Sequence, residues 1–238
     1  MTAVGIVLGV VILVAGFRAL QIARNRRRYA IQEIPGFLSE AECDHLIERA
    51  TPLIRESKVV HEGVRGSSHE ARRSGTAFLD QAGDAVLHQI KSRIAELTGT
   101  RLAQQERTQI THYLEGEGYG PHFDSLRASK LETGPPGDRL CTVILYLNDD
   151  YEGGATRFAR IARRVRPEKG KAVYFQNLLS DGKDWDPLAL HTGETVRSGE
   201  KWISNQWIRE RDRNPTVAQG GRGSGVRGGG KRRKHGKR

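Results

Sequence analysis

The chain has 238 residues, enough for one sizeable domain with tails, and its 37% hydrophobic content excludes disorder of the whole chain. Its net charge of +11 lies at the two ends: five Arg and no acidic residue in 18–28, and eight Lys or Arg and no acidic residue in 215–238. The stretch between them is close to neutral, which excludes a uniformly basic nucleic-acid-binding fold. Two cysteines, Cys43 and Cys141, exclude a disulfide-dense scaffold and a zinc site built from cysteines.

The N-terminal segment is apolar. Fifteen uncharged residues run from Ala3 to Phe17, and the stretch reaches Leu20 if the head group of Arg18 lies at the membrane interface. A buried core helix and a signal peptide are the alternatives, but a signal peptide carries its positive charge before the apolar run, and here the arginines follow it. We therefore expect residues 1–28 to form an uncleaved single-pass anchor with a basic flank. The positive-inside rule places the following domain on the cytoplasmic side.

Two helices open the globular domain, which we expect over residues 29–213. Ser39 and Glu42 form a capping box, and apolar residues at helical spacing follow, so the sequence predicts a helix over 40–51. A second helix is predicted over 84–97, because one face is apolar and Gly99 lies just past its end.

Short strand-like segments follow the second helix, and no further helix is predicted. They lie at 105–114, 119–124, 139–147, 155–159, 171–176, 189–196 and 201–209. The order of elements predicts a mainly β fold with supporting helices (α+β), as a sandwich or barrel. The polar segments 57–75 and 125–138 are predicted to be mobile loops. The Gly-rich basic tail, 214–238, is predicted to be disordered.

Candidate metal ligands lie in the strand-rich half. In His122-Phe123-Asp124, the first and third side chains share one face of a strand, so an imidazole and a carboxylate reach the same point. The other histidines lie on the predicted helices, in the polar loop, in the tail or, at His112, on the face opposite Tyr113, which leaves His191 as the third ligand. Two His and one carboxylate with open positions are typical of non-haem Fe(II) oxygenases. Zinc hydrolases use the same donors, often from an H-E-x-x-H helix, which is absent here.

Lys201 begins the last predicted strand. Strand parity places it on one face with Ile203, Asn205 and Trp207. A lysine on an apolar and aromatic face is unfavourable unless it is paired, and solvent exposure is the alternative. Beside a candidate Fe(II) centre, we interpret Lys201 as the partner of the distal carboxylate of 2-oxoglutarate.

Several motifs together resemble the 2-oxoglutarate- and Fe(II)-dependent prolyl 4-hydroxylases. The resemblance spans residues 30–210 and is carried by the segments Ile34–Cys43, Arg73–Thr76, Tyr113–Asp124, Arg139–Asn148, Glu152–Thr156 and His191–Trp202. It implies a double-stranded β-helix (jelly-roll) fold. It also implies hydroxylation of peptidyl proline at C4 with release of succinate and CO2. Fe(II), 2-oxoglutarate, O2 and ascorbate are the implied cofactors and co-substrates, and the two predicted loops are the implied substrate lids.

The resemblance assigns roles residue by residue. His122, Asp124 and His191 match the iron ligands, Lys201 matches the carboxylate-binding residue, and Tyr113 matches a residue that hydrogen-bonds the same carboxylate. Tyr119, Arg139, Glu106 and Trp207 match positions near the peptide substrate. Glu106 and Tyr113 are seven residues apart, so on an unbroken strand they would face opposite sides, and both serve the pocket only if a bulge intervenes.

The sequence leaves open alternatives to a prolyl hydroxylase on the cytoplasmic side. Nucleic-acid demethylases of the same superfamily place arginines six and twelve residues past the last histidine ligand; Arg197 fits the first position, but Ile203 occupies the second. Lysyl hydroxylases usually carry Arg in place of Lys201. A catalytically dead binding module is the third alternative, and the family's frequent place in the secretory pathway makes a lumenal domain the alternative to a cytoplasmic one. The basic tail fits a contact with anionic lipid or with nucleic acid.

Overall fold

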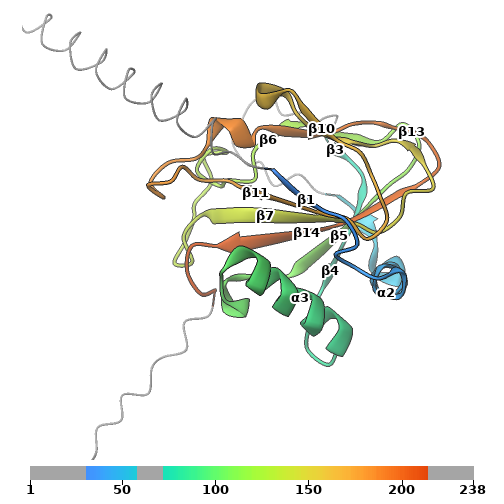
Figure 1. The fold of residues 1–238 in the computed structure, drawn as a ribbon, viewed down its shortest axis with the longest axis horizontal. Helices are drawn as coiled ribbons and strands as arrows, with labels where there is room; N and C mark the ends of the chain where they lie inside the picture. The colour runs from blue at the N-terminus through green and yellow to red at the C-terminus, as the bar shows by residue number, and fades with distance from the viewer. Residues whose placement is uncertain (1–30, 58–71, 214–238) are drawn as a thin grey trace, which may run out of the picture.

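The computed structural model describes residues 31–57 and 72–213. Two antiparallel sheets face each other, and two helices cover the outer face of the larger sheet (Figure 1). This arrangement is the expected jelly-roll with supporting helices. A further pair of strands, β8 (Glu152–Gly153) and β13 (Val196–Ser198), forms a separate ribbon.

The larger sheet has seven strands in the order β1-β11-β7-β14-β5-β4-β2. Their bounds are Gln32–Ile34 for β1, Arg55–Glu56 for β2, Gly75–Leu79 for β4, Thr108–Tyr113 for β5, Arg139–Tyr146 for β7, Ala172–Gln176 for β11 and Lys201–Arg209 for β14. The smaller sheet has five strands in the order β10-β9-β12-β6-β3. Their bounds are Arg72–Arg73 for β3, Gly118–His122 for β6, Thr156–Phe158 for β9, Arg163–Val165 for β10 and His191–Gly193 for β12.

Both predicted helices are confirmed. Helix α2 (Glu40–Ala50) begins at the capping box: the Ser39 hydroxyl accepts from the Glu42 amide at 3.3 Å, and the Glu42 carboxylate accepts from the Ser39 amide at 2.9 Å. Helix α3 (Ala85–Thr98) is capped by Asp84 and ends at Gly99, whose φ of 65° is the left-handed conformation that glycine adopts readily. The remaining helical elements are short 3-10 turns: η1 (Thr51–Leu53), η3 (Leu102–Gln104), η4 (Ala159–Ile161) and η5 (Pro187–Ala189).

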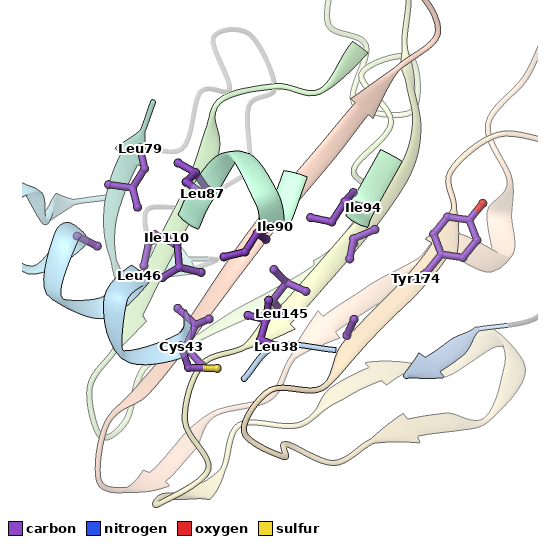
Figure 2. Close-up of a cluster of buried hydrophobic side chains, with 14 of the residues drawn as sticks. Leu38, Cys43, Leu46, Leu79, Leu87, Ile90, Ile94, Ile110, Leu145 and Tyr174 are labelled. Carbon is purple, nitrogen blue, oxygen red and sulfur yellow. The ribbon is translucent and has the colours of Figure 1, made fainter. Parts of the chain in front are cut away.

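The main hydrophobic core lies between these helices and the larger sheet. Figure 2 shows side chains of α2 and α3, among them Leu46 and Ile90, pointing toward Ile110 and Leu145 of the sheet. A second cluster, which includes Phe158, Val173 and Phe175, lies between the two sheets. The larger sheet therefore has one face in the structural core and one face toward the smaller sheet.

The predicted strands agree with the structure in place but not in every boundary. The segment 105–114 is a strand only from Thr108, and the segment 119–124 is a strand only to His122. The segment 189–196 contains two short strands, β12 and the start of β13, in different sheets. The strands that sequence patterns missed are short or begin inside a predicted loop: β1, β2, β3, β4, β8 and β10. Strands of two or three residues are too short to display an alternating pattern.

The segment 57–75 is not a loop throughout, because β3 and the first residue of β4 lie inside it; residues 58–71 are outside the described part. The segment 125–138 contains no helix or strand, as expected. Its ends are tied together by the buried Asp138 carboxylate, which accepts from the Ser125 hydroxyl at 2.7 Å and the Leu126 amide at 2.6 Å.

The predicted membrane anchor (1–28) and the predicted disordered tail (214–238) lie outside the described residues. Within residues 31–57 and 72–213, neither helix has the length and apolar character needed to cross a membrane.

Candidate active site

The three predicted metal ligands come together in the smaller sheet. His122 is the last residue of β6 and His191 is the first residue of β12, and these residues are direct partners in the antiparallel pairing of the two strands. Asp124 follows β6 by two residues. Its carboxylate lies 3.8 Å from His122 Nε2 and 3.9 Å from His191 Nε2. All three donor atoms lie within 4.8 Å of one another, as one metal ion requires.

The backbone fixes how both histidines present their nitrogens. His122 Nδ1 lies 2.9 Å from the carbonyl oxygen of Gly120, and His191 Nδ1 lies 2.9 Å from that of Ala189. A carbonyl only accepts hydrogen bonds, so Nδ1 carries the proton in each ring. Nε2 of each ring therefore faces Asp124, and it is the nitrogen that binds a metal once its proton is lost.

The Asp124 carboxylate is buried and is positioned from the larger sheet. Its Oδ2 accepts a 2.7 Å hydrogen bond from the hydroxyl of Thr142 on β7, and the same hydroxyl accepts at 2.9 Å from the amide of Asn177. Burial raises the pKa of Asp124, but the imidazoles of His191 and His122 outweigh it and hold the pKa below its ordinary value. The carboxylate is therefore ionised and oriented for metal binding.

Lys201 lies at the other end of the same pocket. It is the first residue of β14, directly opposite Tyr113 on β5, and it is 2% exposed. Its ammonium donates to the carbonyl of Gly154 at 2.6 Å and lies 5.0 Å from the centre of the Tyr113 ring. Burial lowers the pKa of Lys201 to about 7. A carboxylate arriving in this pocket would restore the charged form.

Gly154 makes room for this lysine. Its φ is +61°, and a Cβ atom there would lie 2.7 Å from the Tyr151 ring and 3.0 Å from the Lys201 side chain. A larger residue would displace Lys201 and the carbonyl that it binds.

One pocket joins the two ends of the site. Predicted residues that line it are Tyr113, Tyr119, His122, Asp124, His191, Lys201 and Trp207. Ile203 and Asn205 line it too, which confirms the predicted shared face of β14. Sequence reasoning missed Gln109, Ile144, Thr156 and the positioning residue Thr142. The alternation of side chains along β7 could have identified Thr142, because it is a polar residue in an apolar strand and shares a face with Ile144.

Tyr146 was also missed. It lies on the same face of β7, fully buried, and its hydroxyl lies 2.6 Å from that of Thr156. Its ring centre is 5.8 Å from the Lys201 ammonium, so two tyrosine rings, those of Tyr113 and Tyr146, flank the cation.

A groove continues outward from the metal ligands and contains the four residues predicted to lie near the substrate. Arg139 pairs with Glu106 at 2.9 Å, and its guanidinium lies 3.7 Å from the centre of the Trp207 ring. Tyr119 stacks on His122 with ring centres 3.6 Å apart. Burial raises the pKa of Glu106, but Arg139 and Arg209 beside it hold that pKa below its ordinary value.

The predicted conflict between Glu106 and Tyr113 does not arise. Glu106 precedes β5, which begins at Thr108, so the two residues do not share one strand and no bulge is needed. The Glu106 amide instead donates to the carbonyl of Trp207 at 2.8 Å.

Other described histidines have partners elsewhere. His112 stacks on Trp202 with ring centres 4.0 Å apart and lies 2.9 Å from Glu200, away from the pocket as predicted. His45 lies 3.0 Å from Asp84 on the helical side. Over residues 31–57 and 72–213, His122, Asp124 and His191 are the group of His, Cys, Asp and Glu side chains that converges as a metal site. Their donor types suit Fe(II) with open positions toward the pocket.

Comparison with known proteins places these features in one family. Residues 108–209 match the family model described as 2OG-Fe(II) oxygenase superfamily. The Arabidopsis thaliana protein named Probable prolyl 4-hydroxylase 6 is 36% identical over 197 residues, covering 74% of this chain and 67% of that protein. Prolyl 4-hydroxylase subunit alpha-1 of Rattus norvegicus is 34% identical, and the match covers 73% of this chain but 33% of the subunit.

A solved structure is also similar. The viral collagen prolyl hydroxylase of Paramecium Bursaria Chlorella virus-1, solved as a 2-oxoglutarate complex, aligns with a TM-score of 0.60 and 28% identity, over 75% of this chain and 95% of that one. The chain belongs to the prolyl 4-hydroxylase family of 2-oxoglutarate- and Fe(II)-dependent oxygenases.

Proposed function

We propose that this protein is a peptidyl-proline 4-hydroxylase that consumes 2-oxoglutarate and O2 and releases succinate and CO2. The observation that carries the proposal is a single pocket with an Fe(II)-type ligand set at one end and a buried, carboxylate-seeking lysine at the other. Bound Fe(II) would supply the oxidative chemistry, and ascorbate would keep it reduced. The protein supplies position and electrostatics.

Different residues of the chain bind the metal and the co-substrate. His122, Asp124 and His191 hold the metal, with their protons and orientations set by Gly120, Ala189 and Thr142. Lys201 binds the distal carboxylate of 2-oxoglutarate as its charge partner, and Tyr113, directly across the sheet, donates a hydrogen bond to the same carboxylate. This anchoring orients the co-substrate lengthwise, so that its keto-acid end points toward the histidines.

The outer groove holds the peptide. Arg139 is fixed by Glu106 and lies flat on Trp207, so the three side chains form a rigid wall beside the metal site. Tyr119, stacked on His122, offers an aromatic surface on the opposite strand layer. Aromatic walls suit proline-rich peptides, which arrive already extended and lose little conformational entropy on binding.

The test is co-substrate turnover with defined acceptors. The purified protein is given Fe(II), 2-oxoglutarate and ascorbate with a proline-rich peptide, a lysine-containing peptide without proline, or a methylated oligonucleotide. We expect succinate formation and 4-hydroxyproline, identified by mass spectrometry, with the first acceptor alone. Turnover of the lysine peptide or the oligonucleotide in preference to proline would assign the site to another substrate class. No turnover with any acceptor would support a binding module.

We also propose that residues 1–28 anchor the enzyme in a membrane, with the domain on the cytoplasmic side, and that the basic tail is dispensable for chemistry. The support is the apolar run followed by five arginines, and eight further basic residues in a tail without apolar periodicity. A truncated protein of residues 29–214 should turn over a proline-rich peptide as fast as one that ends at Arg238. Fractionation should place the full chain in membranes and the truncated protein in the soluble fraction. Vesicles with anionic lipid and short DNA duplexes then distinguish a lipid contact of the tail from a nucleic-acid contact.

A further inference from the structure

Two of the three exposed large apolar side chains of the described residues lie in one place. Phe78 on β4 is 44% exposed, Leu53 in η1 is 47% exposed, and both line the groove that contains His122 and Asp124. Exposed apolar side chains scattered singly need no explanation, but two at one end of a groove that begins at a metal centre mark a contact surface. Leu114, the third, is 48% exposed and lies outside the groove lining.

The sheet register places Phe78 in line with the pocket. Phe78 pairs with Gln109, Gln109 with Asn205, and Asn205 with Ile144. Directly paired residues of an antiparallel sheet point to the same face, and the last three of this row line the metal pocket. Phe78 therefore lies on the same face of the larger sheet as these pocket residues, and it is 44% exposed.

The spacing of this row gives a length. Strands lie about 4.8 Å apart, so Phe78 is about 10 Å from the β14 position and about 14 Å from the β7 position in the pocket. An extended proline-type peptide advances about 3.1 Å per residue. Along this row Phe78 thus lies roughly three to five peptide residues from the β14 and β7 positions, and β7 is the strand whose Thr142 holds the metal ligand Asp124.

We infer that Phe78 and Leu53 form an apolar subsite for the substrate peptide, which selects an aliphatic or aromatic residue about three to five positions from the proline to be hydroxylated. The inference rests on the proposed function, because the occupant is the peptide whose proline reaches the metal site. The groove is continuous from the metal ligands to both side chains, and this continuity identifies the occupant.

The surroundings fit an apolar side chain rather than a charged one. The nearby cation Arg107 is already paired with Asp80 at 3.0 Å and lies 5.7 Å from the centre of the Phe78 ring. Deeper in the groove, Arg139 is paired with Glu106. Arg55 and Glu56, which also line the groove, are opposite in sign, so the charges along this path balance and the remaining feature at its outer end is apolar surface.

The experiment compares synthetic peptides that hold one proline in a serine-rich background. Leucine replaces serine at the third, fourth or fifth position, before or after the proline. For the wild-type enzyme we expect leucine in one of these positions to lower the peptide KM by roughly tenfold, with kcat little changed.

Matched variants locate the effect. Phe78→Thr and Leu53→Gln should remove the leucine preference and leave turnover of a short proline peptide unchanged, because a short peptide does not reach the subsite. Leu114→Thr, a change of similar exposure outside the groove, should keep the preference. Circular dichroism of each variant checks that the fold is retained.

The possible outcomes distinguish failure of the subsite inference from failure of the proposed function. Hydroxylation of all peptides without a leucine preference, or a preference that survives in both groove variants, overturns the subsite and leaves the prolyl hydroxylase proposal standing. Absence of hydroxylation from every peptide, with 2-oxoglutarate turnover on another acceptor, overturns both.

Discussion

The two faces of the larger sheet are built from the same strands but from different kinds of residue. On β7, Cys141, Val143 and Leu145 point to the helices, whereas Thr142, Ile144 and Tyr146 point to the smaller sheet. The helix-side cluster consists mainly of aliphatic side chains, and the opposite face contains polar groups that are bonded to one another or turned to the pocket. Because side chains alternate along a strand, one segment serves stability and chemistry at once. Substitutions one residue apart should therefore have different consequences.

The largest effect is expected for the metal ligands. His122→Ala, Asp124→Ala or His191→Ala should each reduce succinate formation to background, because each removes a donor atom from a three-ligand site. The melting temperature should change little, since the main core lies on the opposite face of the larger sheet. His112→Ala is the matched control and should retain activity, because that ring stacks on Trp202 outside the pocket. Succinate formation near the wild-type rate by any of the three ligand variants would contradict the assignment.

The next largest effect is expected at Lys201. Lys201→Ala removes the charge partner of a buried carboxylate, an interaction worth about 3–5 kcal/mol when one partner is lost, so the KM for 2-oxoglutarate should rise by roughly two to four powers of ten. Metal affinity, measured with Mn(II), should stay near that of the wild type. Lys201→Arg should rescue in part, because the guanidinium keeps the charge in a different shape. An unchanged KM in the alanine variant would place the carboxylate site elsewhere.

The helix-side face should respond in stability instead. Leu145→Ala, between Ile144 and Tyr146 of the pocket face, should lower the free energy of unfolding by about 2–5 kcal/mol, because a side chain that is 1% exposed leaves a cavity among the helices. The KM for 2-oxoglutarate of the folded fraction should stay within twofold, roughly 0.4 kcal/mol, of the wild-type value. Denaturant titration and steady-state kinetics measure the two quantities, and a loss confined to kinetics would contradict the division of the sheet.

The alternation of side chains also explains which elements and site residues could be predicted from the sequence. Both helices, the longer strands, the convergence of His122, Asp124 and His191 and the burial of Lys201 in the same pocket could be predicted, because capping residues, alternation and chemically unusual side chains are local signals. The shorter strands could not, since two or three residues display no period. Thr142 and Tyr146 were missed because their roles depend on which strands pair: the Thr142 hydroxyl meets Asp124 only when β7 lies beneath the end of β6. The position of Phe78 in line with the pocket depends on the register of four strands.

A smaller effect is expected from Thr142. Thr142→Val keeps the shape but removes the hydroxyl that donates to Asp124 at 2.7 Å, so the ligand loses its positioning partner. Changes in such supporting residues typically weaken metal binding by about 10–100-fold. Mn(II) titration of the purified protein measures the loss, and Thr142→Ser should restore most of the affinity because it keeps the donor. Equal metal affinity in the valine variant and the wild type would show that Asp124 is positioned without this bond.

The smallest effect is a pH dependence specific to the lysine end of the pocket. Burial holds the pKa of Lys201 near 7 in the free enzyme, and the distal carboxylate of 2-oxoglutarate would raise this pKa by favouring the charged form. Binding is then strongest below pH 7 and weakens as the pH rises above the free pKa, where a proton must be taken up before the ion pair forms. Between pH 7 and pH 8 the KM for 2-oxoglutarate should rise roughly fivefold. Lys201→Arg separates this effect from titration of the histidines: arginine stays charged throughout this range, so its KM, though higher at pH 7, should not show the rise. A rise of equal size in both proteins would assign the titration to another group, and a flat wild-type profile would mean that Lys201 is fully charged before the co-substrate binds.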